Sequence, residues 1–443
     1  MTEKDKLAEI NRLIKEIVDE RSASNWTPGQ GTVQYAGSTF TAEEYQSAVG
    51  SLLTGWLGLD KKAHVFEKKF PSFLGKPSGL LTNSGSSANL LMMAALTSKR
   101  WFNLQQGTKV ITPVAGFPTT VNPILQMGFT PVFVDIEPES LNIDVNQLEA
   151  AAKDGARVLM FAHVLGNPPN MRDVMTIVKK YDLIMLEDCC DALGSTYEGR
   201  PLGSFGVMAS CSFYPAHHMT MGEGGFVAVS DKDKLKVVQA FRDWGRGCYC
   251  AGQEAGKLLH GTCGERFKPW LESMPETTFD HKYVYEEIGF NLKPIELQAA
   301  MGLEQMKKLP WIKNRRKHNF EKLSEVFEPY QDSFKLPKAT PGSDPSWFAF
   351  PVTVKSKAFT RSDITQFLES KKIQTRTYFG GNILMQPAYR HLPGAHDARE
   401  KFPVSTMVTR DTFFLGTSPI ITDEQIDYIG SVLIEFMGSK QCS

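Results

Sequence analysis

Six short apolar runs recur between residues 110 and 231, and helical stretches separate several of them. Each run is nearly continuous in apolar residues rather than alternating, which is typical of a strand that is buried on both faces. Buried strands that alternate with helices predict an α/β fold, with a mostly parallel sheet covered by helices on both sides. The runs are VITPV (110–114), PVFVDI (131–136), RVLMFAHV (157–164), LIMLEDC (183–189), ASCSFY (209–214) and FVAVSD (226–231).

The pattern divides the 443-residue chain into three segments. Residues 1–60 predict an N-terminal helix and arm, and residues 61–313 predict a large α/β domain that contains the apolar runs. A polar, loop-rich insertion interrupts this domain at about 246–287. Residues 314–443 predict a smaller α+β domain. Helices outside the sheet region are expected to begin near Glu3, Pro294 and Arg361.

The chain carries 49 Lys and Arg against 49 Asp and Glu, so its formal net charge is zero. A balanced chain has no general electrostatic attraction for nucleic acid or for an anionic membrane. The sequence contains no run of about 18 apolar residues, and its charged N-terminus lacks the apolar region of a signal peptide. We therefore expect a cytoplasmic protein with neither nucleic-acid nor membrane partners.

The stretch LLTNSGSSANLLMMAAL places Gly85, Ser86 and Ser87 where an apolar run meets the start of a predicted helix. Free backbone N–H groups and hydroxyls at a helix N-terminus bind phosphate. A serine at such a position is also an ordinary helix cap. The segment is therefore a candidate phosphate site, with a simple N-cap as the alternative.

Two further candidates follow the ends of predicted strands. Asp188 ends a very apolar run, and Phe117 follows VITPV within GFPTT. Ligands of open α/β sheets bind beyond the carboxyl ends of the strands. Asp188 is thus a candidate partner for a protonated ring nitrogen, and Phe117 a candidate cover for a planar cofactor. A solvated acid and a core phenylalanine are the respective alternatives.

The stretch SFYPAHHMTMGEGG joins the end of a predicted strand to a Gly-rich turn. Ser212 stands at its start, and His217 follows five residues later. This context is typical of a cofactor site at a strand end. The alternative for His217 is a hydrogen-bonded histidine of the core or surface.

Seven cysteines occur in a long chain that we expect to be cytoplasmic, so a disulfide framework is not expected. Cys248, Cys250 and Cys263 lie in a polar, Gly-rich segment, which favours metal or cluster ligation over burial in a core. Because side chains alternate along a strand, an Asp188 that faces the site places Cys190 on the same side. Zinc and an iron–sulfur cluster both fit such thiol ligands.

The order and spacing of these motifs resemble the DegT/DnrJ/EryC1 sugar aminotransferase and dehydrase family. The resemblance runs from about residue 30 to the C-terminus and includes VDIEP, FAHVLGNPPNM, EDCCDALGSTYEGRPLGSFG and GFNLKPIELQAAMGLEQMKKL. It implies the aspartate-aminotransferase-type fold (pyridoxal-phosphate fold type I). Family members normally have a lysine five residues after the serine of SF, which binds pyridoxal phosphate as a Schiff base. Here that position is His217, and an imidazole cannot form this bond.

The resemblance is strongest to a branch in which histidine replaces this lysine and the enzyme removes a sugar hydroxyl. This implies pyridoxamine phosphate held without a covalent bond. One iron–sulfur subgroup has a cysteine, 57 intervening residues and then Cys-x-Cys, a spacing that Cys190, Cys248 and Cys250 match. The fourth cysteine normally follows after seven residues, whereas twelve separate Cys250 from Cys263 here. The four thiols imply a [2Fe–2S] cluster.

The resemblance also implies a role for each site residue. His217 would be the catalytic base, and Asp188 would pair with the ring nitrogen. Asp191 would lie near the ring hydroxyl, and Phe117 would stack on the ring. Asn291 would reach the phosphate of a neighbouring subunit, which implies a homodimer. Around the phosphate itself the implied residues are Gly85, Ser86, Ser87 and Ser212.

The implied activity is removal of the C3 hydroxyl from a nucleotide-linked 4-keto-6-deoxyhexose, with CDP-4-keto-6-deoxy-D-glucose as the expected substrate. The pathway would make 3,6-dideoxyhexoses for O-antigen lipopolysaccharide. An NADH-dependent flavin iron–sulfur reductase would supply two electrons. Three alternatives stay open: a cluster-free dehydratase coupled to glutamate, a nucleotide-sugar aminotransferase, and a non-catalytic zinc-binding protein on the same fold.

Overall fold

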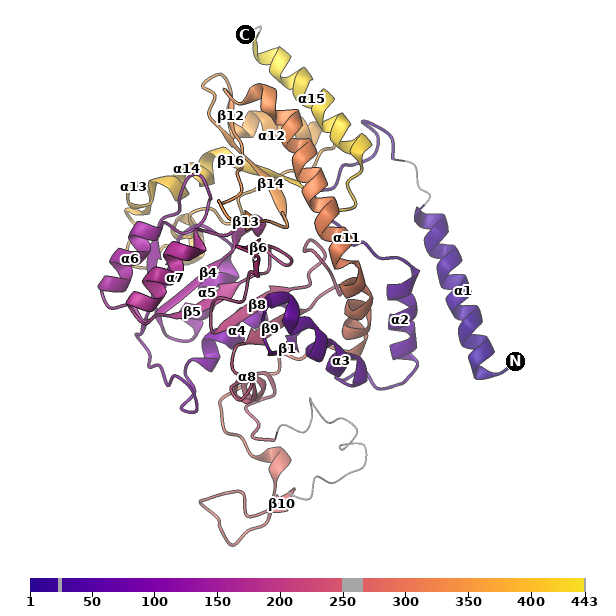
Figure 1. Ribbon diagram of the computed structural model, residues 1–443, viewed down its shortest axis with the longest axis vertical. Coiled ribbons are helices and arrows are strands. Elements are labelled where there is room, and N and C mark those ends of the chain that lie inside the picture. The colour runs from indigo at the N-terminus through magenta and orange to yellow at the C-terminus, as the bar shows by residue number, and fades with distance from the viewer. Residues whose placement is uncertain (23–25, 249–265, 442–443) are drawn as a thin grey trace.

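A seven-stranded sheet forms the centre of the protein, which we describe from a computed structural model over residues 1–22, 26–248 and 266–441 (Figure 1). The strand order is β1-β9-β8-β5-β4-β2-β3. Within this sheet β9 alone is antiparallel to its neighbours, which confirms the predicted mostly parallel sheet. The strands are β1 (Ser78–Thr82), β2 (Lys109–Pro113), β3 (Thr130–Val134), β4 (Val158–Ala162), β5 (Ile184–Asp188), β8 (Met208–Ser212) and β9 (Gly225–Val229).

Helices cover both faces of this sheet (Figure 1). In α7 the residues Val174, Ile177 and Val178 recur at helical spacing, and all three are buried. The near-continuous apolar strands therefore have a packed layer on each side. One layer comprises α4 (Gly85–Ala95), α5 (Pro118–Gln126) and α8 (Leu235–Arg242). The other comprises α3 (Lys61–Lys69), α6 (Val145–Lys153), α7 (Met171–Lys180) and the first part of α11 (Glu296–Phe327).

The C-terminal segment forms a smaller antiparallel sheet of order β12-β14-β16-β15, with helices beside it and a core of its own. Phe350 and Val352 of β14 and Phe413 of β16 are fully buried in that core. The elements are β12 (Phe334–Lys335), β14 (Ala349–Val354), β15 (Arg376–Thr377), β16 (Thr412–Gly416), α12 (Arg361–Ser370), α13 (Ala398–Lys401), α14 (Pro403–Asp411) and α15 (Asp423–Gln441).

Helix α11 connects the two cores as one element of 32 residues. The boundary predicted between residues 313 and 314 falls inside it, and Pro310 is accommodated in its interior. Leu309 packs in the large-domain core, whereas Leu323 packs in the small-domain core. The helix persists across the proline because its buried face continues from one core into the other.

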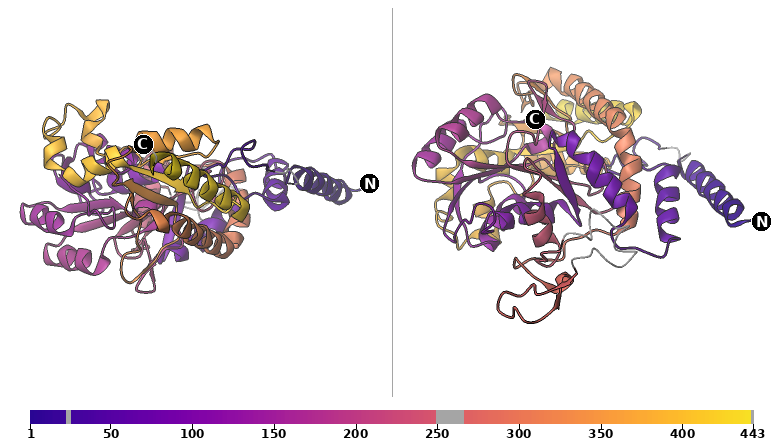
Figure 2. Two further views of the ribbon diagram at one scale, coloured as in Figure 1. Left: turned by 90° about the horizontal axis from the view of Figure 1, so that it is seen from above. Right: turned by 60° about the horizontal axis from the view of Figure 1, so that its bottom comes forward.

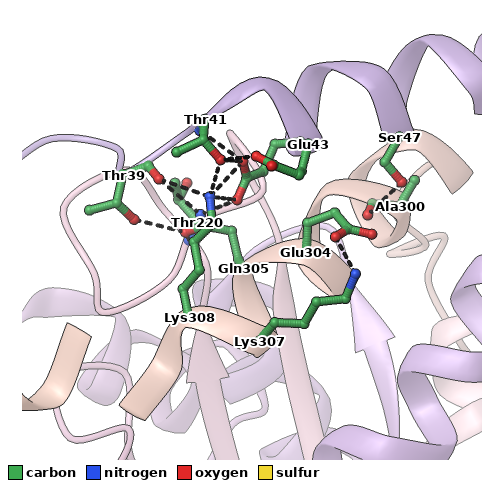
Figure 3. A network of polar contacts seen from close by, with 11 residues as sticks. Thr39, Thr41, Glu43, Ser47, Thr220, Ala300, Glu304, Gln305, Lys307 and Lys308 are labelled. Atoms are coloured by element: carbon green, nitrogen blue, oxygen red, sulfur yellow. Dashed lines mark hydrogen bonds and ion pairs between the residues drawn. The ribbon is translucent and has the colours of Figure 1, made fainter. Parts of the chain in front are cut away.

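The N-terminal segment packs on α11 from outside. Helix α1 (Glu3–Ser22) stands away from the body and packs against α2 (Ala42–Leu52) (Figures 1 and 2). The Gln305 amide donates to the buried Glu44 of α2 at 2.7 Å, and its carbonyl accepts from the N–H of Thr220 at 3.3 Å. Lys308 also donates to Glu44 at 2.8 Å. This network ties α2 to the turn that follows His218 (Figure 3).

The remaining elements are short. Part of the insertion at 246–287 lies in the described residues, where β10 (Phe267–Lys268) pairs with β11 (Phe279–Asp280). A three-stranded sheet joins β6 (Thr196–Tyr197), β7 (Arg200–Pro201) and β13 (Ser343–Asp344). Among the helices of the described segments, none has the length and apolarity that a membrane span requires.

Candidate active site

The carboxyl ends of β4, β5 and β8 open into a cavity of about 550 Å³, which the small domain closes from the other side. The strand arrangement brings together residues from segments far apart in the sequence. Eight of the predicted site residues line this one cavity: Gly85, Ser86, Phe117, Asp188, Cys190, Asp191, Ser212 and His217.

The N-terminus of α4 forms one side of the cavity. Ser84 is the N-cap, and its Oγ accepts the N–H of Ser87 at 3.1 Å. Ser86 is exposed and lines the cavity, whereas the hydroxyl of Ser87 bonds to that of Ser84 at 3.0 Å and does not line it. Ser84 is therefore the residue that caps the helix. Ser86 remains beside the helix N-terminus as a candidate phosphate ligand.

Gly85 is required by the close approach of three segments. A Cβ at this position would lie 2.5 Å from Cβ of Ser212 and 2.9 Å from Sγ of Cys190. No real Cβ tolerates such contacts, so the absent side chain lets α4 begin directly against β8. The helix N-terminus, Ser212 and Cys190 thus meet at one point of the cavity wall.

Asp188 is held rigidly at the end of β5 and is almost completely buried. Its Oδ2 accepts from Nδ2 of Asn89 at 2.7 Å and from the hydroxyl of Thr120 at 2.8 Å. Its Oδ1 accepts the N–H of Cys190 at 3.1 Å. Three donors fix the orientation of this carboxylate.

His217 and Asp191 lie next to each other on the cavity wall, with 3.5 Å between Nδ1 and Oδ1. Burial lowers the pKa of His217 to about 4, against an opposing effect of Asp188. Burial, reinforced by the charge of Asp188, raises the pKa of Asp191 to about 7. The site therefore holds a neutral imidazole at neutral pH, which can accept a proton.

His218 is built into the scaffold instead. Its Nε2 donates to the carbonyl of Ser346 at 2.6 Å, and burial holds its pKa well below the usual range. The buried Arg316 donates to the carbonyls of Ala216 and His217, both at 3.2 Å. These contacts fix the backbone of the turn from which the His217 side chain enters the cavity.

Aromatic rings form a third wall. Phe117 is the N-cap of α5, and the residue is 52% exposed and lines the cavity, so its ring is open to a ligand. The ring of Phe379 lies edge-on to it, with 6.0 Å between ring centroids. Phe348 lies 5.4 Å from the imidazole of His217. A flat ring entering between these groups would meet aromatic surface and the base together.

The cysteines separate into cavity and core residues, as side-chain alternation predicts. Cys190 lines the cavity, whereas Cys189 and Cys211 are fully buried in the core. Cys248 is partly buried at the end of its described segment. The ligands predicted at Cys250 and Cys263 lie outside the described residues.

One buried group of possible metal ligands does lie within the described segments, formed by His163, Glu187 and Cys189. Glu187 is already satisfied without a metal ion. It bonds to Nε2 of His163 at 3.1 Å and accepts the N–H groups of Gly203 and Phe205, each at 2.8 Å. We therefore interpret this group as a structural hydrogen-bond network.

Asn291 does not line the cavity formed by the described residues of this chain. It is exposed, and its backbone pairs with that of Asp243. Lys293, two residues later, holds Nζ 3.2 Å above the ring of Trp244 and 3.7 Å from Oδ1 of Asp243. Burial lowers the pKa of Lys293 to about 8.

Several site residues were missed by the sequence reasoning. Asn89 and Thr120 orient Asp188, but helical amides and threonines are too common to single out. The position of Asn89 one turn into a helix next to Gly85 was the available signal for it. The remaining missed residues of the cavity wall include Tyr35, Tyr214, Glu223, Phe348, Arg376, Thr377, Phe379 and Phe414.

Comparison with known proteins agrees with this architecture. The DegT/DnrJ/EryC1/StrS aminotransferase family matches residues 39–434. The lipopolysaccharide biosynthesis protein RfbH of Salmonella typhimurium (strain LT2) is 41% identical over 442 residues, which are 99% of each chain. The dTDP-4-dehydro-2,6-dideoxy-D-glucose 3-dehydratase of Saccharopolyspora spinosa is 39% identical over 97% of this chain and 92% of that relative.

One similar solved structure contains a bound cofactor. Escherichia coli GDP-4-keto-6-deoxy-D-mannose-3-dehydratase with bound hydrated PLP matches with a TM-score of 0.77 and 27% identity, over 91% of this chain and all of that one. The fold is therefore that of the fold type I pyridoxal-phosphate enzymes, as predicted. Within that class, the chain belongs to the DegT/DnrJ/EryC1/StrS aminotransferase family.

Proposed function

We propose that this protein is a CDP-4-keto-6-deoxy-D-glucose 3-dehydrase, which removes the C3 hydroxyl of the sugar and replaces it with hydrogen. The observation that supports the proposal is the identity of two residues that line the cavity. His217 occupies the wall five residues after Ser212, where aminotransferases of this family would have their Schiff-base lysine. Cys190, the first residue of the cysteine spacing, lies on the same wall.

The described residues fit pyridoxamine phosphate. The free N–H groups of the α4 N-terminus, with Ser86 and Ser212, form a cradle for a phosphate. Asp188 would hold a protonated ring nitrogen, and Phe117 offers an exposed face for the ring. When bound, the cofactor supplies an amine for the C4 ketone and a ring that accepts electrons.

Two residues of this chain would have separate roles in the reaction. Asp188, fixed by Asn89 and Thr120, would hold its carboxylate against the ring nitrogen. His217 is neutral near pH 7 and takes a proton at Nε2, since Nδ1 is buried beside Asp191. A neutral imidazole cannot bind the cofactor covalently as a lysine does, but it can still act as the base.

The [2Fe–2S] cluster is the second part of the proposal. Cys190, Cys248, Cys250 and Cys263 would bind it. Burial and the nearby Asp188 raise the pKa of the Cys190 thiol well above its usual range, so a bound metal centre would have to stabilise its thiolate. Its place on the cavity wall would set the cluster next to the reacting sugar. An NADH-dependent flavin iron–sulfur reductase would supply electrons one at a time.

The substrate and assembly follow from the same reasoning. The likeness to RfbH supports a place in lipopolysaccharide biosynthesis, with a 3,6-dideoxyhexose as the final sugar. Relatives with dTDP- and GDP-linked substrates support a nucleotide-linked hexose, for which CDP is our proposed carrier. The exposed Asn291, off the cavity of its own chain, supports a homodimer in which it reaches the partner's phosphate.

Iron and acid-labile sulfide analysis of anaerobically purified protein, with an ultraviolet–visible spectrum, tests the cluster. We expect two irons and two sulfides per chain. Cys190→Ser should remove both, whereas Cys442→Ser, at the tail of the chain, should retain both. Zinc in the four-cysteine site would contradict the proposal. Full C3 removal by a metal-free enzyme with glutamate would favour the cluster-free dehydratase.

A further inference from the structure

Part of the exposed rim of the cavity, which we call its mouth, is formed by two segments far apart in the chain. Residues 33–36 of the N-terminal arm lie along residues 372–376 of the small domain. Val33 donates to the carbonyl of Lys372 at 2.9 Å and accepts the N–H of Gln374 at 3.0 Å. The N–H of Tyr35 donates to the Gln374 side chain at 3.3 Å. These bonds hold Tyr35 beside the strand that carries Arg376.

A glycine of the small domain makes this contact tight. A Cβ at Gly416 would lie 1.8 Å from the carbonyl oxygen of Tyr35, so the arm rests directly on the end of β16. The position of Tyr35 is therefore fixed by backbone contacts on two sides. A side chain that stacks on its ring is held in place as well.

Arg376 stacks on that ring. Its guanidinium carbon lies 4.2 Å from the ring centroid of Tyr35, and Nη1 donates to the carbonyl of Thr375 at 2.7 Å. Among the described residues, no carboxylate forms an ion pair with Arg376, and it is the one lysine or arginine that lines the cavity. The stacked guanidinium can therefore donate its remaining N–H groups to a ligand that enters the cavity.

Arg376 lies nearer to solvent than the candidate base His217. Asp188 is 5% exposed and the His217 side chain 16%, whereas Arg376 is exposed. A ligand that reaches His217 with its reacting carbons must leave its remaining part near the mouth. A lone, preoriented guanidinium at that point matches an oxyanion with two acceptor oxygens.

We propose that Arg376, positioned by the ring of Tyr35, binds the diphosphate that joins the substrate's nucleotide to its sugar. The inference rests on the proposed function, because it requires a nucleotide-linked substrate. An amino-acid carboxylate offers the same pair of oxygens, and glutamate is its relevant source. We assign Arg376 to the diphosphate because it lies at the exposed mouth, where the carrier of a nucleotide sugar must pass.

The test measures binding to the holoenzyme loaded with pyridoxamine phosphate, by isothermal titration with CDP, dTDP and GDP. Arg376→Gln should weaken the tightest of these about 10- to 100-fold, the loss expected for charge-assisted hydrogen bonds. Arg376→Lys should recover part of this loss, since a point charge replaces the fork. Arg410→Gln, an exposed arginine of the same domain that is paired with Asp411, is the matched control and should bind like the wild type.

Two variants of Tyr35 test its role as the stacking partner of Arg376. Tyr35→Phe keeps the ring and should bind the nucleoside diphosphate like the wild type. Tyr35→Leu removes the ring face and should weaken binding about 2- to 5-fold. Equal binding by the leucine variant would remove the positioning role.

Glutamate is tested separately, through its conversion of the pyridoxal phosphate form to the pyridoxamine form in the absorbance spectrum. Wild-type affinity for nucleoside diphosphates in Arg376→Gln would overturn the inference and leave the proposed function standing. A defect confined to the glutamate reaction would also overturn it and assign the arginine to a carboxylate. A wild-type enzyme that binds none of the three diphosphates would overturn both proposals.

Discussion

Replacing Gly85 with alanine should disturb the point where the helix N-terminus, Ser212 and Cys190 meet. The new Cβ would lie 2.5 Å from Cβ of Ser212, which is fixed to strand β8 and cannot move aside. Sγ of Cys190 lies 2.9 Å from the same position. Helix α4 must therefore shift, and an overpacked site of this kind costs about 1–3 kcal/mol.

The expected change in melting temperature is small for a chain of this size. With about 2.1 cal/mol/K of unfolding entropy per residue, the 443-residue chain has about 0.9 kcal/mol/K. A loss of 1–3 kcal/mol then lowers Tm by about 1–3 °C. Because the shift moves the N–H groups of the phosphate cradle, we also expect about tenfold weaker binding of pyridoxamine phosphate.

Differential scanning calorimetry and cofactor titration measure both effects. Gly438→Ala is the control, because this exposed glycine of α15 has no heavy atom within 4 Å of an added Cβ. It should leave cofactor binding unchanged and stabilise the helix by about 0.5–1 kcal/mol. A Gly85→Ala protein with wild-type stability and wild-type cofactor affinity would refute the close-packed cradle.

The remaining predictions concern the base and its neighbours. His217→Asn should lower turnover about 10²- to 10⁴-fold in steady-state assays while pyridoxamine phosphate still binds, and near-normal turnover would exclude His217 as the base. His217→Lys should give a Schiff-base absorbance band with pyridoxal phosphate that the wild type lacks, and its absence would show that residue 217 does not reach the aldehyde carbon. The raised pKa of Asp191 means that the folded state keeps a proton the unfolded chain has released, so this carboxyl contributes a loss of stability as the pH rises from about 4 to about 7. His217, whose pKa is lowered to about 4, contributes a gain of stability over much of the same range. Asp191→Asn should remove the loss, so its urea midpoint should change more positively with pH over this range than that of the wild type, and an unchanged slope would contradict the assignment.

Much of the fold was predictable because its strands are buried on both faces and therefore nearly continuous in apolar residues. The run that ends at Asp188 is an example, since all five residues of β5 are buried. Helix α11 was predicted only in its first part. The change of pattern near residue 314 indicated a domain boundary there, whereas packing against two successive cores carries the helix on to Phe327.

The site was predictable where a residue lies next to a strand end in the sequence, as Asp188, Ser212 and His217 do. It was not predictable where the contact joins distant segments. Asn89 is fixed against Asp188 across 99 residues, and Tyr35 meets Arg376 across almost the whole chain. No local pattern marks these pairs, because the small domain and the arm bring them together only in the folded protein.

The account depends most directly on whether the enzyme removes the C3 hydroxyl by reduction. Mass spectrometry of the sugar formed from CDP-4-keto-6-deoxy-D-glucose, with pyridoxamine phosphate and a flavin iron–sulfur reductase supplied with NADH, tests this point in one measurement. We predict a 3-deoxy sugar that forms only when the reductase and NADH are both present. An amino sugar, or a 3-deoxy sugar made equally well with glutamate and no reductase, would contradict the account.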